Sequence, residues 1–185
     1  MKPLKDLFGI ELADLYDAEQ RSLLGLAKMA QAAACPQLGA MLEAQVKDTR
    51  NHIARLEEIT RSLDAKIASR KCEAVVGLLK EAEEIAAAFQ GSPAINVALI
   101  AAAQKLEHYK IAAYGCLREW AGLLDYNDAA GTLDEILAEE KATDEAFTEL
   151  ARSGRNEEAC GAAPEAESYE GFATVANFQS VVEPI

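Results

Sequence analysis

Six side chains that could bind a metal ion interrupt the apolar faces of the expected helices. They are Glu19, Asp48, His52, Glu107, Glu140 and Asp144. Each falls on a helical face that is otherwise mainly apolar when positions are counted by helical turns. A buried carboxylate is costly unless a cation, a metal ion or hydrogen-bond donors face it, or unless it takes up a proton. The pattern therefore indicates a polar centre inside a helical core.

The spacing of these residues repeats along the chain. Glu19 precedes His52 by 33 residues, and Glu107 precedes Glu140 by the same number. Each half of the chain thus offers one carboxylate on a first helix and a second group on the next helix. In a bundle of four helices these side chains come to the same level, about halfway along the bundle.

Carboxylates gathered at one level could not all stay ionised without cations. Carboxylate oxygens and one imidazole suit two divalent ions of iron or manganese better than a metal that prefers thiolates. Asp48 precedes His52 by four residues, and Asp144 follows Glu140 by four. Two residues four positions apart share a helical face almost as well as two residues three positions apart. The usual Glu-x-x-His signature of di-iron bundles, with its three-residue spacing, is absent from the second helix of each hairpin.

Two structural interpretations compete with metal binding. Glu107 could form a salt bridge with a lysine or arginine in the core, because buried charged side chains are usually paired. His52 could be a structural histidine that is bonded to Glu19. His108 follows Glu107 directly and so points about 100° around the helix, which places it at the surface or behind the site.

The elements that must position this centre follow an all-α pattern. Runs of Ala, Leu, Glu, Lys and Gln have helical spacing, and β-branched alternation is almost absent. Long helices are expected at about 4–33, 37–63, 93–124 and 129–153, with a shorter amphipathic helix at 71–89. Proline suits the first turn of a helix, so Pro36 and Pro93 mark two of the starts. The segment 64–92 is predicted to cross the bundle between two helical hairpins.

The chain is expected to contain one domain, residues 1–153, followed by a C-terminal tail, residues 154–185. After Ser153 the composition shifts to Glu, Ala, Gly and Pro, and the last stretch, FATVANFQSVVEPI, is apolar again. A stretch this apolar is too hydrophobic to remain solvated. We therefore expect the tail to pack on its own bundle or on a neighbouring subunit, and we expect a homodimer.

Composition and charge exclude several classes of partner. Eighteen basic residues against 31 acidic ones give a net charge of −13, which repels nucleic acid and anionic lipid. The sequence contains no apolar run long enough to span a bilayer, and its N-terminus lacks the features of a signal peptide. A cytoplasmic protein with no membrane partner is expected. The four scattered cysteines, without a CxxC pair, are expected to be free thiols.

Four segments carry a resemblance to a known family. LKDLFGIELADLYDAEQ, KCEAVVGLLKEAEE, IAAAQKLEHYKIAAYG and LAEEKATDEAFTELA resemble the YciF-type stress proteins of the ferritin-like superfamily, over roughly residues 4–151. The resemblance implies a ferritin-like four-helix bundle with an extra crossover helix, a dimer and a di-iron centre. Relatives of this type often have Glu at the positions of Asp48 and Lys110. The shorter Asp48 and the cationic Lys110 argue against full metal loading in this chain.

Two classes of function follow from these observations. In the first, the protein is a di-metal stress-response protein, with up to two iron ions per chain or manganese in their place, that reacts with peroxide or O₂. In the second, it is a non-catalytic helical bundle that acts through self-association and keeps a vestigial or structural metal site. The sequence identifies no electron donor and no organic substrate.

Overall fold

The computed structural model describes residues 3–63 and 70–155, and regular structure within these residues is entirely helical. The elements are α1 (Leu4–Ala32), α2 (Pro36–Ser62), α3 (Glu73–Ala88), α4 (Ile95–Leu123), α5 (Asn127–Leu150) and a short π-helical segment, η1 (Ala151–Arg155). The predicted all-α fold is confirmed, and each of the five helices lies within a few residues of its expected position.

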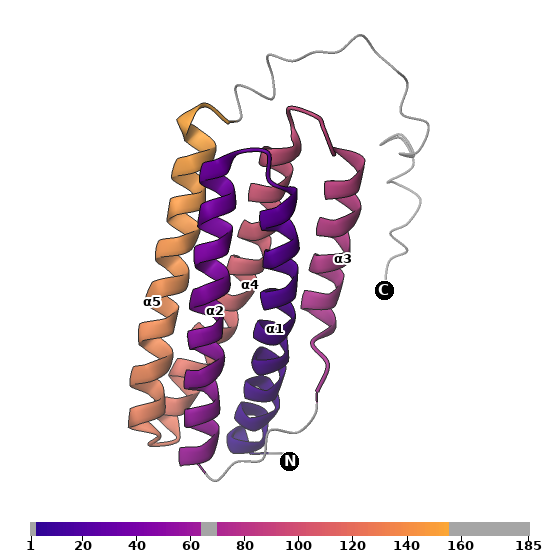
Figure 1. Cartoon of the computed structure of the whole chain (residues 1–185). Helices are drawn as coiled ribbons and strands as arrows, with labels where there is room; N and C mark the ends of the chain where they lie inside the picture. Colours follow the sequence, from indigo (N-terminus) through magenta and orange to yellow (C-terminus); the bar gives the residue numbers. More distant parts are fainter. Residues whose placement is uncertain (1–2, 64–69, 156–185) are drawn as a thin grey trace, which may run out of the picture.

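Four of the helices form the bundle. α1 and α2 make one antiparallel hairpin, α4 and α5 make the other, and the four helices run side by side (Figure 1). α2 and α4 run in the direction opposite to α1 and α5. The middle turns of all four helices are therefore at one level, as the repeated spacing requires.

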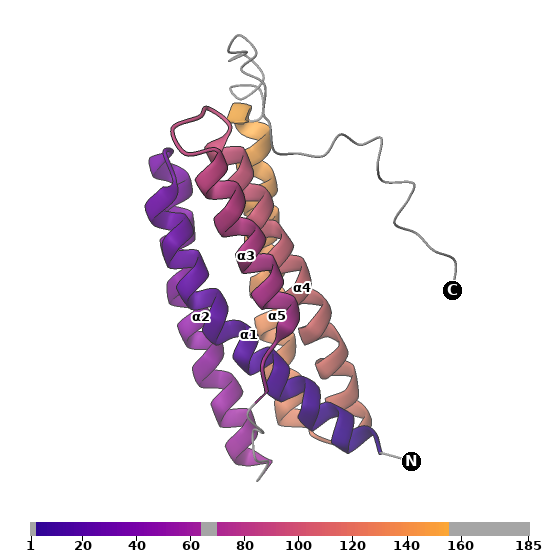
Figure 2. The ribbon, with the colours of Figure 1, turned by 90° about the vertical axis from the view of Figure 1, so that its right-hand side faces the viewer.

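The predicted crossover helix is α3, which lies outside the bundle against α1 and α4 (Figures 1 and 2). Gly25 permits the close approach of α1 and α3, because a Cβ atom on Gly25 would lie 2.1 Å from Cδ2 of Leu79. Val75 and Ala82 are the buried residues of α3. α3 thus returns the chain to the end of the bundle where α4 begins.

The turn between α1 and α2 is bonded to the start of α4. Pro36 begins α2, where its missing N–H costs no hydrogen bond. The side-chain oxygen of Asn96, at the start of α4, accepts hydrogen bonds from the backbone of Ala34 (3.0 Å) and Cys35 (2.9 Å). Asp125 allows the tight α4–α5 turn by adopting a left-handed conformation, with φ of 60°.

The core is built mainly from leucine, isoleucine and alanine. Its buried polar side chains are concentrated in the middle of the bundle. The buried polar side chains are Glu19, Ser22, Gln45, Thr49, His52, Thr60, Glu107, Lys110 and Glu140. Across residues 3–63 and 70–155, every helix is too short or too polar to span a lipid bilayer. The predicted tail falls largely on residues 156–185, which lie outside the described residues.

Candidate metal centre

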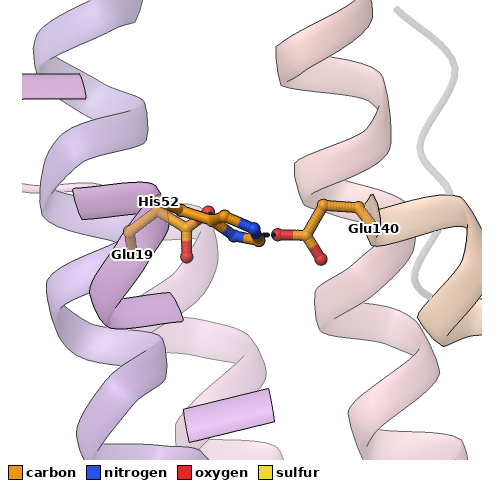
Figure 3. A group of neighbouring side chains, drawn as sticks. All are labelled: Glu19, His52 and Glu140. Atoms are coloured by element: carbon orange, nitrogen blue, oxygen red, sulfur yellow. Dashed lines mark ion pairs between the residues drawn. The ribbon is translucent and has the colours of Figure 1, made fainter. Parts of the chain in front are cut away.

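Three of the predicted ligands come together in the middle of the bundle. Glu19 of α1, His52 of α2 and Glu140 of α5 each offer a ligand atom, and these atoms all lie within 4.8 Å of one another. The imidazole ring of His52 lies between the two carboxyl groups (Figure 3). Its Nδ1 atom is 3.1 Å from Oε1 of Glu140 and 3.7 Å from Oε1 of Glu19. All three side chains are fully buried.

Several atoms of this cluster lack a hydrogen bond. Oε2 of Glu19 and Nδ1 of His52 are buried and find no aligned partner among the described residues. Buried polar atoms are normally satisfied, so an unpaired carboxylate oxygen and an unpaired imidazole nitrogen in one buried cluster call for a ligand. Oxygen and nitrogen ligands bound to one divalent ion at about 2.0–2.2 Å lie at most about 4.4 Å apart. A small inward movement would therefore allow the three groups to hold one ion.

The outer side of His52 is held by a second carboxylate. Its Nε2 atom lies 2.8 Å from Oε2 of Glu139, and Glu139 in turn accepts hydrogen bonds from Arg55 at 2.9 and 3.1 Å. Arg55 also bonds Glu135 at 2.8 Å. A carboxylate behind a ligating histidine fixes the orientation of the ring and makes it a stronger ligand. Glu139 is half exposed, directly precedes Glu140 in the sequence, and was not among the predicted ligands.

Lys110 lies on the other side of Glu140. Its Nζ atom is 2.9 Å from both carboxylate oxygens of Glu140 and 3.1 Å from Oε1 of Glu107. Gln45 donates to the same two carboxyl groups, at 3.1 Å to Glu107 and 3.2 Å to Glu140. Glu107 is therefore paired with a core lysine, one of the alternatives that the sequence left open. Gln45 was not expected to take part.

Tyr114 holds Glu19 in place. Its hydroxyl donates a 2.7 Å hydrogen bond to Oε1 of Glu19, and its ring packs edge-on toward His52 with 6.3 Å between ring centroids. Burial and the nearby carboxylates raise the pKa of Tyr114 well above its usual value, so the hydroxyl stays a donor. This contact leaves Oε2 of Glu19 as the oxygen that is available to a ligand.

The protonation of the centre follows from burial and from these neighbours. Burial alone would lower the pKa of His52, but Glu140 and Glu19 raise it to about 10. Burial raises the pKa of Glu107, and Lys110 offsets only part of that effect. Burial also favours protonated Glu140, but the charge of Lys110 holds the pKa of Glu140 below its usual value. Without a metal ion, protonated His52 and Lys110 face the carboxylates of the centre.

Asp48 and Asp144, two of the other predicted ligands, lie away from this cluster. Asp48 is half-buried beside a surface cavity of about 250 Å³ between α2 and α5, which Gln45 and Phe147 also line. Asp144 accepts a hydrogen bond from Gln104 and lies 3.2 Å from Nδ1 of His108. The assignment of all six residues as metal ligands remains a prediction, and the geometry brings together three of them.

Comparisons with known proteins give a matching family and a similar protein from Escherichia coli. Residues 3–160 match the family described as Domain of unknown function (DUF892). Protein YciF of Escherichia coli K12 is 41% identical over 160 residues, which are 86% of this chain and 96% of that protein. The sequence resemblance to YciF-type proteins is thereby confirmed.

Solved structures agree with these sequence matches. The crystal structure of the E. coli stress protein YciF has a TM-score of 0.81 and covers 84% of this chain and 99% of its own. YcfI of Rhodopseudomonas palustris is 35% identical, with a TM-score of 0.77, and the match covers 80% of this chain and 94% of that one. A protein of Xanthomonas campestris that is 19% identical has a TM-score of 0.62 over 84% of this chain and 99% of its own, and shares the fold.

Proposed function

Because the chain belongs to the DUF892 family and is similar to the stress protein YciF, we propose that it binds a redox-active divalent ion and reacts with peroxide or O₂. The observation that carries this proposal is the buried set of Glu19, His52 and Glu140, which contains an unpaired oxygen and an unpaired nitrogen. Two carboxylates and one imidazole suit iron and manganese. The same ligands discriminate poorly against zinc, so the redox chemistry has to be tested directly.

The residues around the ion have separate roles in this proposal. Oε2 of Glu19, Nδ1 of His52 and a carboxylate oxygen of Glu140 would hold the ion. Glu139 orients the imidazole from behind, and Tyr114 holds Glu19 through its other oxygen. An iron or manganese ion bound there would supply one-electron redox chemistry toward peroxide or O₂. Because the three ligands are fully buried, we expect slow release of the ion.

The number of electrons sets the stoichiometry of the reaction. Reduction of one H₂O₂ to two H₂O consumes two electrons and two protons, and two ferrous ions become ferric. A chain with two ions could supply both electrons, whereas chains with one ion must react in pairs. The ratio of peroxide consumed to protein therefore reports how many redox-active ions each chain carries.

We expect the protein to retain Fe²⁺ and to oxidise it once. Protein loaded anaerobically with Fe²⁺ and desalted should keep at least one ion per chain, as measured by elemental analysis. Mixing with H₂O₂ in a stopped-flow instrument should then produce ferric absorbance that saturates at the amount of retained iron. Zn²⁺-loaded protein is the control, since it should show no absorbance change. Retention below a tenth of an equivalent would contradict metal binding.

A non-catalytic bundle is the second candidate, and the pairing of Lys110 favours it. The ammonium group is fully buried against Glu140 and Glu107, and protonated His52 faces Glu140 and Glu19. This arrangement balances much of the charge without a metal ion, so the polar centre could specify how the helices pack. Iron that is retained but gives no signal with H₂O₂ would leave this structural role.

We also propose that the protein forms a homodimer. Leu24 and Leu123 expose 68% and 74% of their surface, and the tail adds a further apolar stretch. The mass in solution of the full chain, measured by light scattering, should be that of two chains. Removal of residues 154–185 should weaken the dimer if the tail makes the contact. An unchanged dimer would assign the contact to the helices.

A further inference from the structure

We infer that the centre is mononuclear, because the ammonium group of Lys110 occupies the place where a second divalent ion would bind. The inference rests on the proposed metal binding and specifies its stoichiometry. It concerns the side of Glu140 that faces Lys110. There Lys110 contacts the carboxyl groups of Glu107 and Glu140, and Gln45 donates hydrogen bonds to the same two groups. Those are the groups from which a second site would be built.

The contacts of Glu140 are those of a bridging carboxylate. Oε1 of Glu140 lies 3.1 Å from Nδ1 of His52 and 2.9 Å from Nζ of Lys110. Oε2 is 2.9 Å from the same Nζ atom and accepts from Gln45. In a two-metal centre a carboxylate in this position links two ions. Here it links the proposed ion position to a lysine.

The second position offers too few ligands for another ion. Oε1 of Glu107 and both oxygens of Glu140 already face Lys110, which is fully buried and tethered to α4. Oε2 of Glu107 is the remaining unpaired oxygen on this side. One carboxylate oxygen cannot satisfy the coordination of a divalent ion. A second ion could enter only if the lysine moved out of the core.

The internal repeat explains why the first position differs. Lys110 follows Glu107 by three residues, and Ser22 follows Glu19 by three residues, so the two occupy equivalent positions. Ser22 is buried, and its hydroxyl finds no partner among the described residues. The first half of the repeat thus places a small neutral group where the second half places an ammonium. The proposed divalent ion binds beside Glu19, and the ammonium group of Lys110 takes the equivalent place beside Glu107.

Charge balance leads to the same stoichiometry. The largest negative charge that Glu19, Glu107 and Glu140 can carry together is three, with all of them ionised, and Lys110 carries one positive charge. One divalent ion brings the sum to zero, whereas two would leave two uncompensated positive charges in the core. Uncompensated buried charge is strongly unfavourable. Replacing Lys110 with Glu changes the balance so that two divalent ions are needed.

The test counts Mn²⁺ in wild-type protein and in Lys110→Glu. Each full-length protein is loaded anaerobically with excess Mn²⁺, desalted, and measured by elemental analysis and by electron paramagnetic resonance. We expect one Mn²⁺ per wild-type chain, with the six-line spectrum of an isolated ion. Lys110→Glu should bind two, with the spectrum of a spin-coupled pair. Lys141→Glu, an equal charge change at an exposed position of α5, should remain at one.

The outcomes separate the stoichiometry from metal binding itself. Two ions in wild-type protein, or one ion in folded Lys110→Glu, would overturn the mononuclear centre while metal binding stands. No retained Mn²⁺ or Fe²⁺ in wild-type protein would overturn the proposed function and, with it, this inference. If Lys110→Glu does not fold, the count and the spectrum of the wild-type protein decide alone.

Discussion

Replacement of Glu140 by alanine is expected to lower the free energy of unfolding of the metal-free protein by about 3–5 kcal/mol, the usual cost of breaking a buried ion pair. Glu140 is fully buried and accepts two 2.9 Å hydrogen bonds from Lys110. Without it, the ion pair that Lys110 keeps within the described residues is the 3.1 Å contact with Glu107, and His52 loses its nearest buried carboxylate. The measurement is urea unfolding in the presence of EDTA, followed by circular dichroism.

The matched control for this prediction is Glu145→Ala. Glu145 lies on α5 but is exposed, so its removal should change the free energy of unfolding by less than about 0.5 kcal/mol. A double variant, Glu140→Ala with Lys110→Met, should recover part of the lost stability, because it removes the unpaired ammonium as well. A loss below 1 kcal/mol in Glu140→Ala would contradict the prediction and show that Lys110 pairs fully with another carboxylate.

Most of the fold could be predicted from sequence because its determinants are local. Apolar residues recur at helical spacing, and Pro36 and Pro93 mark boundaries that the structure places within two residues. The role of the 64–92 segment followed from its length and from the single amphipathic helix within it. The placement of α3 on α1 and α4 did not follow, since it depends on the close approach at Gly25.

The level of the candidate centre could also be predicted, because equal spacing in two hairpins brings middle turns together. Which side chains meet there was harder to foresee. The four-residue spacing between Asp48 and His52 leaves about 40° between them around the helix axis, and Asp48 faces the α2–α5 cavity instead. Two residues can therefore lie on the same helical face without contributing to the same site.

Two participants were missed because of the reach of their side chains. Gln45 lies nearly two turns from His52 along α2, yet its amide bonds Glu107 and Glu140 on other helices. Glu139 leaves α5 about 100° around the helix from Glu140, but the imidazole of His52 projects far enough to reach it. Helical periodicity predicts where a side chain leaves the helix. The polar end of a long side chain can form its hydrogen bonds one turn or more away from that point.

We expect the substitution Glu19→Gln to weaken Mn²⁺ or Fe²⁺ binding about 100-fold or more, since even residues behind a metal ligand contribute about 10–100-fold. Glutamine has the shape of glutamate and keeps an oxygen that can accept the 2.7 Å hydrogen bond from Tyr114. It removes the negative charge and places an NH₂ group, which cannot bind a metal, at the position of Oε2. The fold should therefore survive while the site is lost.

The measurement is a competition between the protein and a metal-sensitive dye, with Glu43→Gln as the control. Glu43 is exposed on α2, so its substitution removes the same charge and should leave the affinity unchanged. Circular dichroism of Glu19→Gln should match that of the wild-type protein, which separates loss of the site from loss of the fold. Unchanged affinity in Glu19→Gln would mean that the ion binds elsewhere in the chain. In that case the unpaired oxygen of Glu19 would need a different explanation, such as a buried water molecule.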